Sequence, residues 1–198
     1  MALAFNGSSN IITGLAVGGL PDGVVDTDML AANAVTAAKA TGSAKGITEL
    51  DQWSLTANKT SNGDITSNLS RNSFSGSACP LGTGMSQSSG VFSFPSTGKY
   101  LIICEANLIL EDSDNVYIQT QVTLNNGTSF TAVTNAGDGN NGSGDREGQG
   151  TSFYFLDVTD ISQVKVKFTI ISITGGSFVK GDSSQLSTSF TFIRIGDT

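Results

Sequence analysis

Residues 90–100 read Gly-Val-Phe-Ser-Phe-Pro-Ser-Thr-Gly-Lys-Tyr, and an apolar run follows them directly. Phe92 and Phe94 are two positions apart, as on one face of a strand, and the next Pro and Gly bracket a turn. Tyr100 then opens a second strand, whose alternate positions are Ile102, Cys104, Ala106, Leu108 and Leu110. The pattern predicts a β-corner, in which a tight turn joins two strands of an all-β domain.

Alternating apolar residues recur along the chain after about residue 47. Between residues 116 and 124 one face is apolar and the other carries Tyr117 and polar residues, which is typical of a strand with one wet side. An Asn-Asn-Gly turn ends this strand. Further strands are expected at 53–57, 130–133, 153–155, 164–170 and 186–195. The last of them is apolar on both faces near its end, which places it centrally in a sheet or against a neighbouring subunit. The series predicts a sandwich or barrel.

The composition limits the classes of function. The chain has 198 residues, of which 24 are glycine and 3 proline, and its formal net charge is -7 with a pI near 4.3. Binding to a nucleic-acid backbone needs clustered Lys and Arg, so no nucleic-acid partner is expected. The apolar start, residues 1–5, is too short for a secretory leader or a membrane span and lacks basic residues. We therefore expect neither membrane insertion nor secretion by a leader.

Residues 1–47 differ in kind from the rest. They contain no Trp and only one aromatic residue, Phe5, so they cannot bury a core alone. A weak ten-residue repeat aligns residues 25–34 with 35–44, and such repeats usually need neighbours along the chain or from other copies. A compatible interpretation is a short helix over residues 29–39, capped by Asp28. We expect an extended or partly helical segment at 1–47 and a separate domain at 48–198.

The corner has the spacing Phe-x-Phe-Pro-x-x-Gly-x-Tyr, and this resembles the hallmark of the jelly-roll heads of the complement-q and tumour-necrosis-factor superfamily. The order of the other strands is similar over about 150 residues, although Ile161-Ser162-Gln163 stands where these heads often carry Gly-Asp. The resemblance implies a jelly-roll sandwich that assembles as a compact homotrimer. The residues expected at the trimer interface are Tyr100, Tyr117, Phe190 and Phe192.

A second resemblance lies in the N-terminal segment. Residues 30–39 read Leu-Ala-Ala-Asn-Ala-Val-Thr-Ala-Ala-Lys, which resembles a phrase found in trimeric phage tail-fibre and virion-appendage proteins. It implies that residues 1–47 form an attachment and trimerisation segment that docks to other virion proteins of the tail or capsid. The residues expected to dock to the particle are Leu15, Leu20, Val25, Met29, Leu30 and Val35.

Enzyme chemistry has little support in the sequence. The chain has no histidine, which removes Ser-His and Cys-His nucleophile pairs and the usual zinc sites. Paired carboxylates remain conceivable, as in glycosidases, but the acids cluster in stretches that are typical of polar loops. Cys79 and Cys104 could form one disulfide, whereas the place of Cys104 among core positions favours a free thiol. No enzyme and no cofactor are expected.

The most unusual stretch is the Gly-, Asn- and Asp-rich segment 136–150, which is expected to form a long polar loop. Its oxygen-bearing side chains Asp138, Asn140 and Asp145 are weak calcium candidates, because calcium takes hard oxygen ligands and complement-q-like heads sometimes carry it. Long loops on rigid scaffolds also carry recognition residues. The receptor-contact candidates are Asp138, Asn141, Asp145 and Arg146.

These observations together predict a non-enzymatic, homotrimeric structural protein of a phage virion, of the tail-fibre type. Its N-terminus would dock to the particle, and its jelly-roll heads would recognise a glycan or protein of the host surface. A capsid decoration or head-fibre protein is the first alternative, and a cellular complement-q-like ligand is the second.

Overall fold

The computed structural model describes residues 4–6, 11–13, 46–77 and 79–198. The chain divides into two compact units, Met1–Ala44 and Lys45–Thr198. In the first unit, β1 (Ala4–Asn6) and β2 (Ile11–Thr13) pair as an antiparallel hairpin. The six predicted docking residues and the predicted helix at 29–39 lie outside the described residues.

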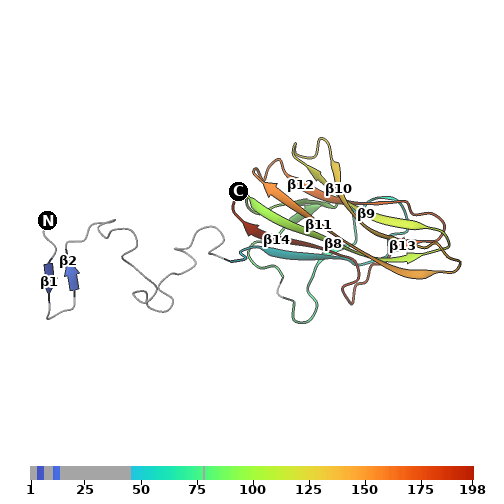
Figure 1. Ribbon diagram of the computed structural model, residues 1–198, viewed down its shortest axis with the longest axis horizontal. Coiled ribbons are helices and arrows are strands. Elements are labelled where there is room, and N and C mark those ends of the chain that lie inside the picture. Colours follow the sequence, from blue (N-terminus) through green and yellow to red (C-terminus); the bar gives the residue numbers. More distant parts are fainter. Residues whose placement is uncertain (1–3, 7–10, 14–45, 78) are drawn as a thin grey trace. The chain divides into compact units, whose positions relative to one another are not determined.

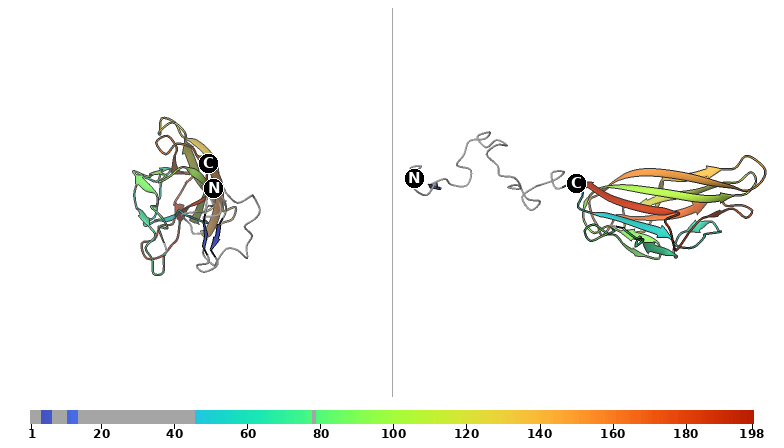
Figure 2. Two further views of the ribbon diagram at one scale, coloured as in Figure 1. Left: turned by 90° about the vertical axis from the view of Figure 1, so that its left-hand side faces the viewer. Right: turned by 90° about the horizontal axis from the view of Figure 1, so that it is seen from below.

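The second unit, here called the head, is built from two antiparallel sheets (Figures 1 and 2). The β8 sheet has the order β11-β8-β14-β3-β5, and β13 also pairs with β8. The β9 sheet has the order β10-β9-β12-β7-β6, and β4 also pairs with β12. Their bounds are β3 Leu50–Leu55, β4 Gly63–Asp64, β5 Leu69–Arg71, β6 Ser86–Ser88, β7 Val91–Ser93, β8 Gly98–Leu110, β9 Asn115–Thr123, β10 Thr131–Gly139, β11 Arg146–Val158, β12 Lys165–Ile171, β13 Phe178–Val179 and β14 Ser189–Gly196.

The chain passes repeatedly from one sheet to the other, and the described residues contain no helix. It goes from β7 to β8, from β8 to β9, from β10 to β11 and from β11 to β12, changing sheet each time. The long strands therefore enclose a single core between two layers, as a jelly roll does. The predicted all-β jelly-roll sandwich is confirmed.

The predicted corner makes the first of these crossings. Phe92 lies on β7 and Tyr100 on β8, and both side chains are buried. The phenol oxygen of Tyr100 donates to the backbone oxygen of Ser96 at 3.1 Å, so the turn is tied to the strand that follows it. The ring of Phe92 lies 5.5 Å from that of Trp53 and 5.1 Å from that of Phe192, measured between centroids. The aromatic residues of the corner thus form the centre of the core.

The strand β14 lies between β8 and β3, which confirms its predicted central place. Its inward side chains, Phe190 and Phe192, are 0% and 1% exposed, and Tyr100 of the adjacent strand is 1% exposed. These three residues were expected at the trimer interface. The structure corrects that expectation, because side chains enclosed between the two sheets cannot touch a second subunit.

The loop within segment 136–150 is shorter than the composition of the segment predicts. β10 continues to Gly139 and β11 begins at Arg146, so only residues 140–145 lie between strands. Four glycines lie in the strands where a neighbour approaches closely, namely Gly137, Gly139, Gly148 and Gly150. A Cβ atom at Gly139, for example, would lie 2.0 Å from the side-chain oxygen of Asn115 on the neighbouring strand. Glycine here permits close packing within the sandwich rather than a free loop.

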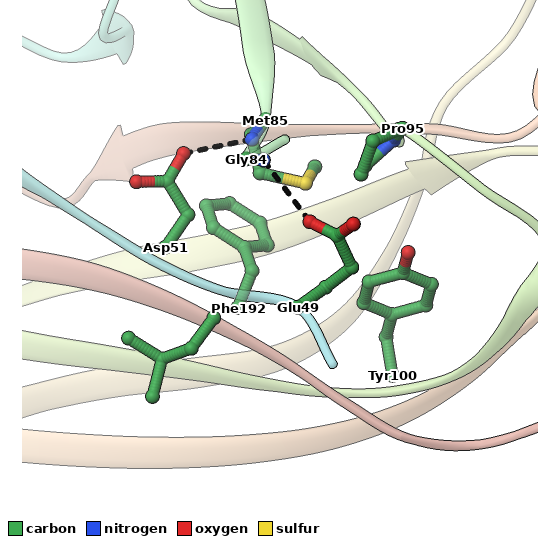
Figure 3. A pocket seen from close by; sticks show the side chains of 8 residues that line it. Glu49, Asp51, Gly84, Met85, Pro95, Tyr100 and Phe192 are labelled. Atoms are coloured by element: carbon green, nitrogen blue, oxygen red, sulfur yellow. Dashed lines mark hydrogen bonds between the residues drawn. The ribbon is translucent and has the colours of Figure 1, made fainter. Parts of the chain in front are cut away.

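The buried carboxylate of Asp51 links the β8 sheet to Met85, the residue just before the edge strand β6 of the β9 sheet (Figure 3). Asp51 on β3 is 2% exposed and accepts hydrogen bonds from Trp53 Nε1 at 2.9 Å, Arg71 Nε at 3.0 Å and the backbone nitrogen of Met85 at 2.7 Å. Glu49 accepts from the backbone nitrogen of Gly84 at 3.0 Å, as the same view shows. Because β6 begins directly after Met85, these bonds set where that strand starts.

Two further features complete the head. Cys79 and Cys104 are both free thiols, and Cys104 is 0% exposed. Burial raises the pKa of the Cys104 thiol far above its ordinary value. Among the described residues, no helix has the length and apolar character needed to cross a membrane.

Candidate subunit interface on the β8 sheet

The outer face of the β8 sheet is ordered in rows that run across its strands. Strand pairing sets Phe155 beside Leu101, Leu101 beside Ile193, and Ile193 beside Leu50. One row further on, the pairing sets Phe153 beside Ile103. All of these side chains alternate with buried ones, so they point away from the core. The apolar rows consist of Leu50, Leu101, Ile103, Phe153, Phe155 and Ile193.

The two phenylalanines are the most exposed members of the apolar rows. Phe153 is 59% exposed and Phe155 is 68% exposed, although both lie within the regular strand β11. Leu101, Ile103 and Ile193 are half-buried beside them. A contiguous apolar patch on a sheet face is typical of an interaction site rather than of surface left to solvent.

The same face becomes polar beyond the apolar rows. Thr151 pairs with Glu105, and Glu105 pairs with Ser189, whose hydroxyl donates to the Glu105 carboxylate at 2.7 Å. In the following row Gln149 pairs with Asn107. A backbone hydrogen bond joins Glu49, just before β3, to Arg194, near the end of β14. The apolar rows therefore lie at the end of the head where the chain enters and leaves. The face thus changes from apolar to polar along the strand direction.

A second apolar feature lies on the other side of β11. The edges of the two sheets part there and leave a cleft of about 490 Å³. Tyr154, which points inward from β11, is half-buried at this opening, and Leu124 at its rim is 68% exposed. The cleft is lined by Val122, Leu124, Asn125, Ser129, Thr131, Val133, Tyr154, Leu156 and Asp157. β11 therefore separates two apolar surfaces of different shape.

The residues predicted for the interface do not lie on the apolar rows. Tyr117 is on β9, in the opposite sheet, where its ring closely approaches Gly137. Phe153 and Phe155 were recognised as a strand but not as interface residues. The available signal was that their strand is apolar on both faces, since Tyr154 and Leu156 alternate with them.

The predicted calcium and receptor residues lie around the loop 140–145. Asp138 forms an ion pair with Arg146. Asn140 is 4% exposed, and its amide nitrogen donates to the backbone oxygens of Glu111 at 3.0 Å and Gly144 at 2.8 Å. Its side-chain oxygen accepts from Gly142 N at 3.0 Å, so this amide already has partners on both sides. Asn141 and Asp145 are exposed. Calcium binding and receptor contact stay predictions.

A buried acid stabilises the same end of the head. Asp114 is 4% exposed. Burial by itself raises the pKa of this carboxyl, but hydrogen bonds from Ser177, Thr174 and the backbone of Asn115 more than offset it and hold the pKa below its ordinary value. The hydroxyl of Thr174 donates to Asp114 at 2.7 Å. Over the described residues, no group of three or more Cys, Asp or Glu side chains is arranged to hold a metal ion.

Comparison with known proteins identifies the fold. No family profile matches the chain, and no curated protein sequence matches it. Among solved structures, Eiger TNF from S. frugiperda is similar with a TM-score of 0.56 and 9% identity, covering 75% of this chain and 93% of that one. Murine APRIL at pH 8.5 gives a TM-score of 0.52 at 9% identity, covering 74% and 98%. Murine APRIL at pH 5.0 gives 0.54 at 8% identity, with the same coverage.

At these identities the likeness concerns the fold alone. The head has the jelly-roll fold of tumour-necrosis-factor-like proteins, and the predicted resemblance of residues 48–198 to that fold is confirmed.

Proposed function

We propose that the protein is a non-enzymatic homotrimer whose heads associate through the apolar rows and present their far loops to a binding partner. The exposure of Phe153 and Phe155, 59% and 68%, carries this proposal. Two large aromatic side chains at the β11 edge of an apolar patch are costly to leave in water, and association with further copies buries them. The family resemblance of the corner at residues 90–100 points to three copies.

The shape of the head fits a cyclic assembly. Around a three-fold axis, each contact joins two different surfaces, one from each neighbouring subunit. The head offers two such surfaces, the apolar rows and the cleft beside Tyr154, on opposite sides of β11. A ring of three would place the exposed aromatic residues of one copy against the edge of the next. Closure would also cover the edge of β11 beside Tyr154, where the two sheets part.

The absence of an enzymatic role is supported by chemistry. The sequence has no histidine, and the buried Cys104 thiol has a raised pKa, so it is a poor nucleophile. Asp114 and Asp51 are held in hydrogen bonds that secure loops and strands. We therefore assign the head to recognition and assembly.

The finer proposal is that the trimer belongs to a phage virion, as a tail-fibre type appendage. The resemblance of residues 30–39 to virion-appendage proteins supports it. The head is also suited to this task. Its chain enters at one end, beside Arg194, and loop 140–145, which joins β10 to β11, lies at the other end. A head attached through its N-terminus would present that loop outward.

Light scattering coupled to size exclusion tests the trimer. The full chain, 20.4 kDa, is expected to run at three times its monomer mass. Replacing both phenylalanines by charge, Phe153→Glu with Phe155→Glu, should give a folded monomer. Gln119→Glu puts a charge on the opposite sheet and should leave the trimer intact. A wild-type monomer would contradict the proposal, as would a double variant that stays trimeric.

Gold labelling of the protein on intact particles tests the place in the virion. Label at the tail would support the appendage role. Label over the shell would instead make the protein a capsid decoration, and particles without label would contradict both assignments.

A further inference from the structure

A groove with an uncharged lining lies between two loops on one side of the head. The first loop, residues 72–77, follows β5, and the second, residues 184–186, precedes β14. Both loops project from the lower side of the head in Figure 1. The space between them is about 560 Å³, which is within the usual range for small-molecule sites. The groove lies apart from loop 140–145, the predicted receptor loop.

The first wall is held in place by its own hydrogen bonds. The Asn72 amide nitrogen donates to Gln52 Oε1 at 2.6 Å, and the Asn72 side-chain oxygen accepts from the backbone nitrogen of Phe74 at 3.1 Å. The hydroxyl of Ser77 donates back to the backbone oxygen of Asn72 at 3.1 Å. Since Gln52 belongs to β3, this wall is fixed to an inner strand of the β8 sheet.

The second wall is ordered around one acid. Asp182 accepts from the backbone nitrogen and the hydroxyl of Ser184, both at 2.7 Å, and from the amide nitrogen of Gln185 at 3.0 Å. Within the described part of the chain, no hydrogen bond joins this wall to residues 72–77. The groove is consequently pre-formed and open, rather than closed by its own polar groups.

The lining has the chemistry of a sugar site. It consists of Asn72, Phe74, Ser75, Gly76, Ser77, Ser184, Gln185 and Leu186. Amides and hydroxyls can donate to and accept from the hydroxyl groups of a pyranose. Phe74 is half-buried and Leu186 is 39% exposed, so both offer apolar surface to the C–H face of a sugar ring. None of the lining residues is charged, so the groove offers an anionic glycan no cation to pair with.

We propose that this groove binds a neutral glycan, with Phe74 as the platform under a sugar ring and with Ser75 and Gln185 as the hydrogen-bonding residues. Gly76 lies at a backbone φ of +80°, a conformation that glycine adopts without strain, so it permits the turn of the first wall. The inference rests on the proposed role in surface recognition and gives it a ligand class and a site. Three copies of a weak site in one trimer would raise the avidity for a glycan-coated surface.

The test uses the full-length protein on a printed array of neutral and anionic oligosaccharides of microbial and mammalian origin, followed by titration calorimetry with the strongest ligands. Binding to neutral oligosaccharides is expected. Phe74→Ala should weaken it by about tenfold or more, since an aromatic–sugar contact of this kind is worth about one decade of affinity. Gln185→Ala should also weaken it, and Ser75→Trp should block the groove sterically.

Gln119→Ala, on the opposite sheet, is the matched control and should bind as the wild type does. Asn141→Ala probes the predicted receptor loop 140–145. Melting curves and light scattering on every variant establish that it is folded and in which oligomeric state. Binding of anionic glycans alone, no binding of any glycan, or equal binding by wild type and Ser75→Trp would overturn the inference. Loss of binding in Asn141→Ala alone would move the site to the far loop and leave the proposed function standing. A monomeric wild type would count against the proposed trimer and not against the groove.

Discussion

Gly150 of β11 lies directly against Gly137 of β10, and the contact joins the two sheets of the head at their edges. A Cβ atom at Gly150 would lie 2.1 Å from the backbone nitrogen of Gly137 and 2.6 Å from its backbone oxygen. The atoms in the way belong to the backbone and cannot rotate aside. At the far end of the same strand the sheets part into the cleft beside Tyr154.

Gly150→Ala is therefore expected to destabilise the head, by about 1–3 kcal/mol, as overpacking of a tight interior does. The measurement is the free energy of unfolding in urea. Gly142→Ala is the matched control, because a Cβ atom there would only make an ordinary contact of 3.5 Å with Asn140. Equal stability of the two variants would show that β10 and β11 do not close as described.

The carboxylate of Asp51 should be worth more than any surface ion pair. Asp51→Asn keeps the volume but leaves Arg71 without its anion. It also replaces one of the two carboxylate oxygens, which accept from Arg71 and from Met85 N, by an amide nitrogen. Since the Arg71 side chain is 35% exposed and can reach water, we expect a loss of about 2–4 kcal/mol, towards the lower side of what breaking a buried ion pair costs.

The control for Asp51 is Glu147→Gln. Its pair with Lys180 has a Glu147 side chain that is 69% exposed, so about 0–1 kcal/mol is expected there. Thermal unfolding of both variants decides the comparison. If Asp51→Asn melts with the wild type, the anchoring of Met85 does not depend on this charge.

Asn140→Asp separates a structural role from a calcium role. The amide nitrogen of Asn140 donates to backbone oxygens of Glu111 and Gly144, and a carboxylate would face these oxygens without a proton to donate. We expect a loss of about 1–3 kcal/mol, in calcium and in chelator alike, because buried acceptors lose their partner. A variant stabilised by added calcium would instead support the calcium prediction for Asp138, Asn140 and Asp145.

The groove wall should give the head a measurable acid dependence. Hydrogen bonds from the side chain and backbone of Ser184 and from Gln185 lower the pKa of Asp182 from 3.8 to about 2. The folded head binds this proton less readily than the unfolded chain, so the stabilisation is complete above about pH 4 and is lost as the pH falls towards 2.

Asp182→Asn should accordingly flatten the fall in unfolding free energy between pH 4 and pH 2. Urea unfolding at a series of pH values measures it. Identical slopes for variant and wild type would show that the wall of the groove is not built around this carboxylate.

The sequence was most informative where structure depends on neighbours in the chain. The alternation around Phe92, Phe94 and Tyr100 predicts the corner, because the turn and both strands are encoded within a few residues. The strand predicted over residues 116–124, with one wet face, corresponds to β9 (Asn115–Thr123) for the same reason. That the two strands of the corner belong to different sheets was not encoded locally, because it depends on the packing of Phe92 against Trp53 and Phe192.

Features that depend on pairing between distant strands were not predictable in this way. An aromatic residue in an apolar strand does not reveal which face is covered, so Phe190 and Phe192 were placed at a subunit contact while Phe153 and Phe155 were not. The row that joins Phe153 to Ile103 exists only through the pairing of β11 with β8. Glycines such as Gly137 and Gly150 were taken for loop residues although they lie in strands, because a backbone contact like theirs leaves no trace in the local sequence pattern.

The hydrogen bond between Glu49 O and Arg194 N, 2.9 Å long, has a practical meaning for engineering the head. It holds the start of β3 beside the end of β14, so a short linker can join residue 198 to residue 46. New chain ends can then be opened within loop 140–145, between Gly142 and Ser143, where no strand is interrupted. Such a circularly permuted head retains every strand pairing of the two sheets, and it reverses which end of the sandwich is tethered.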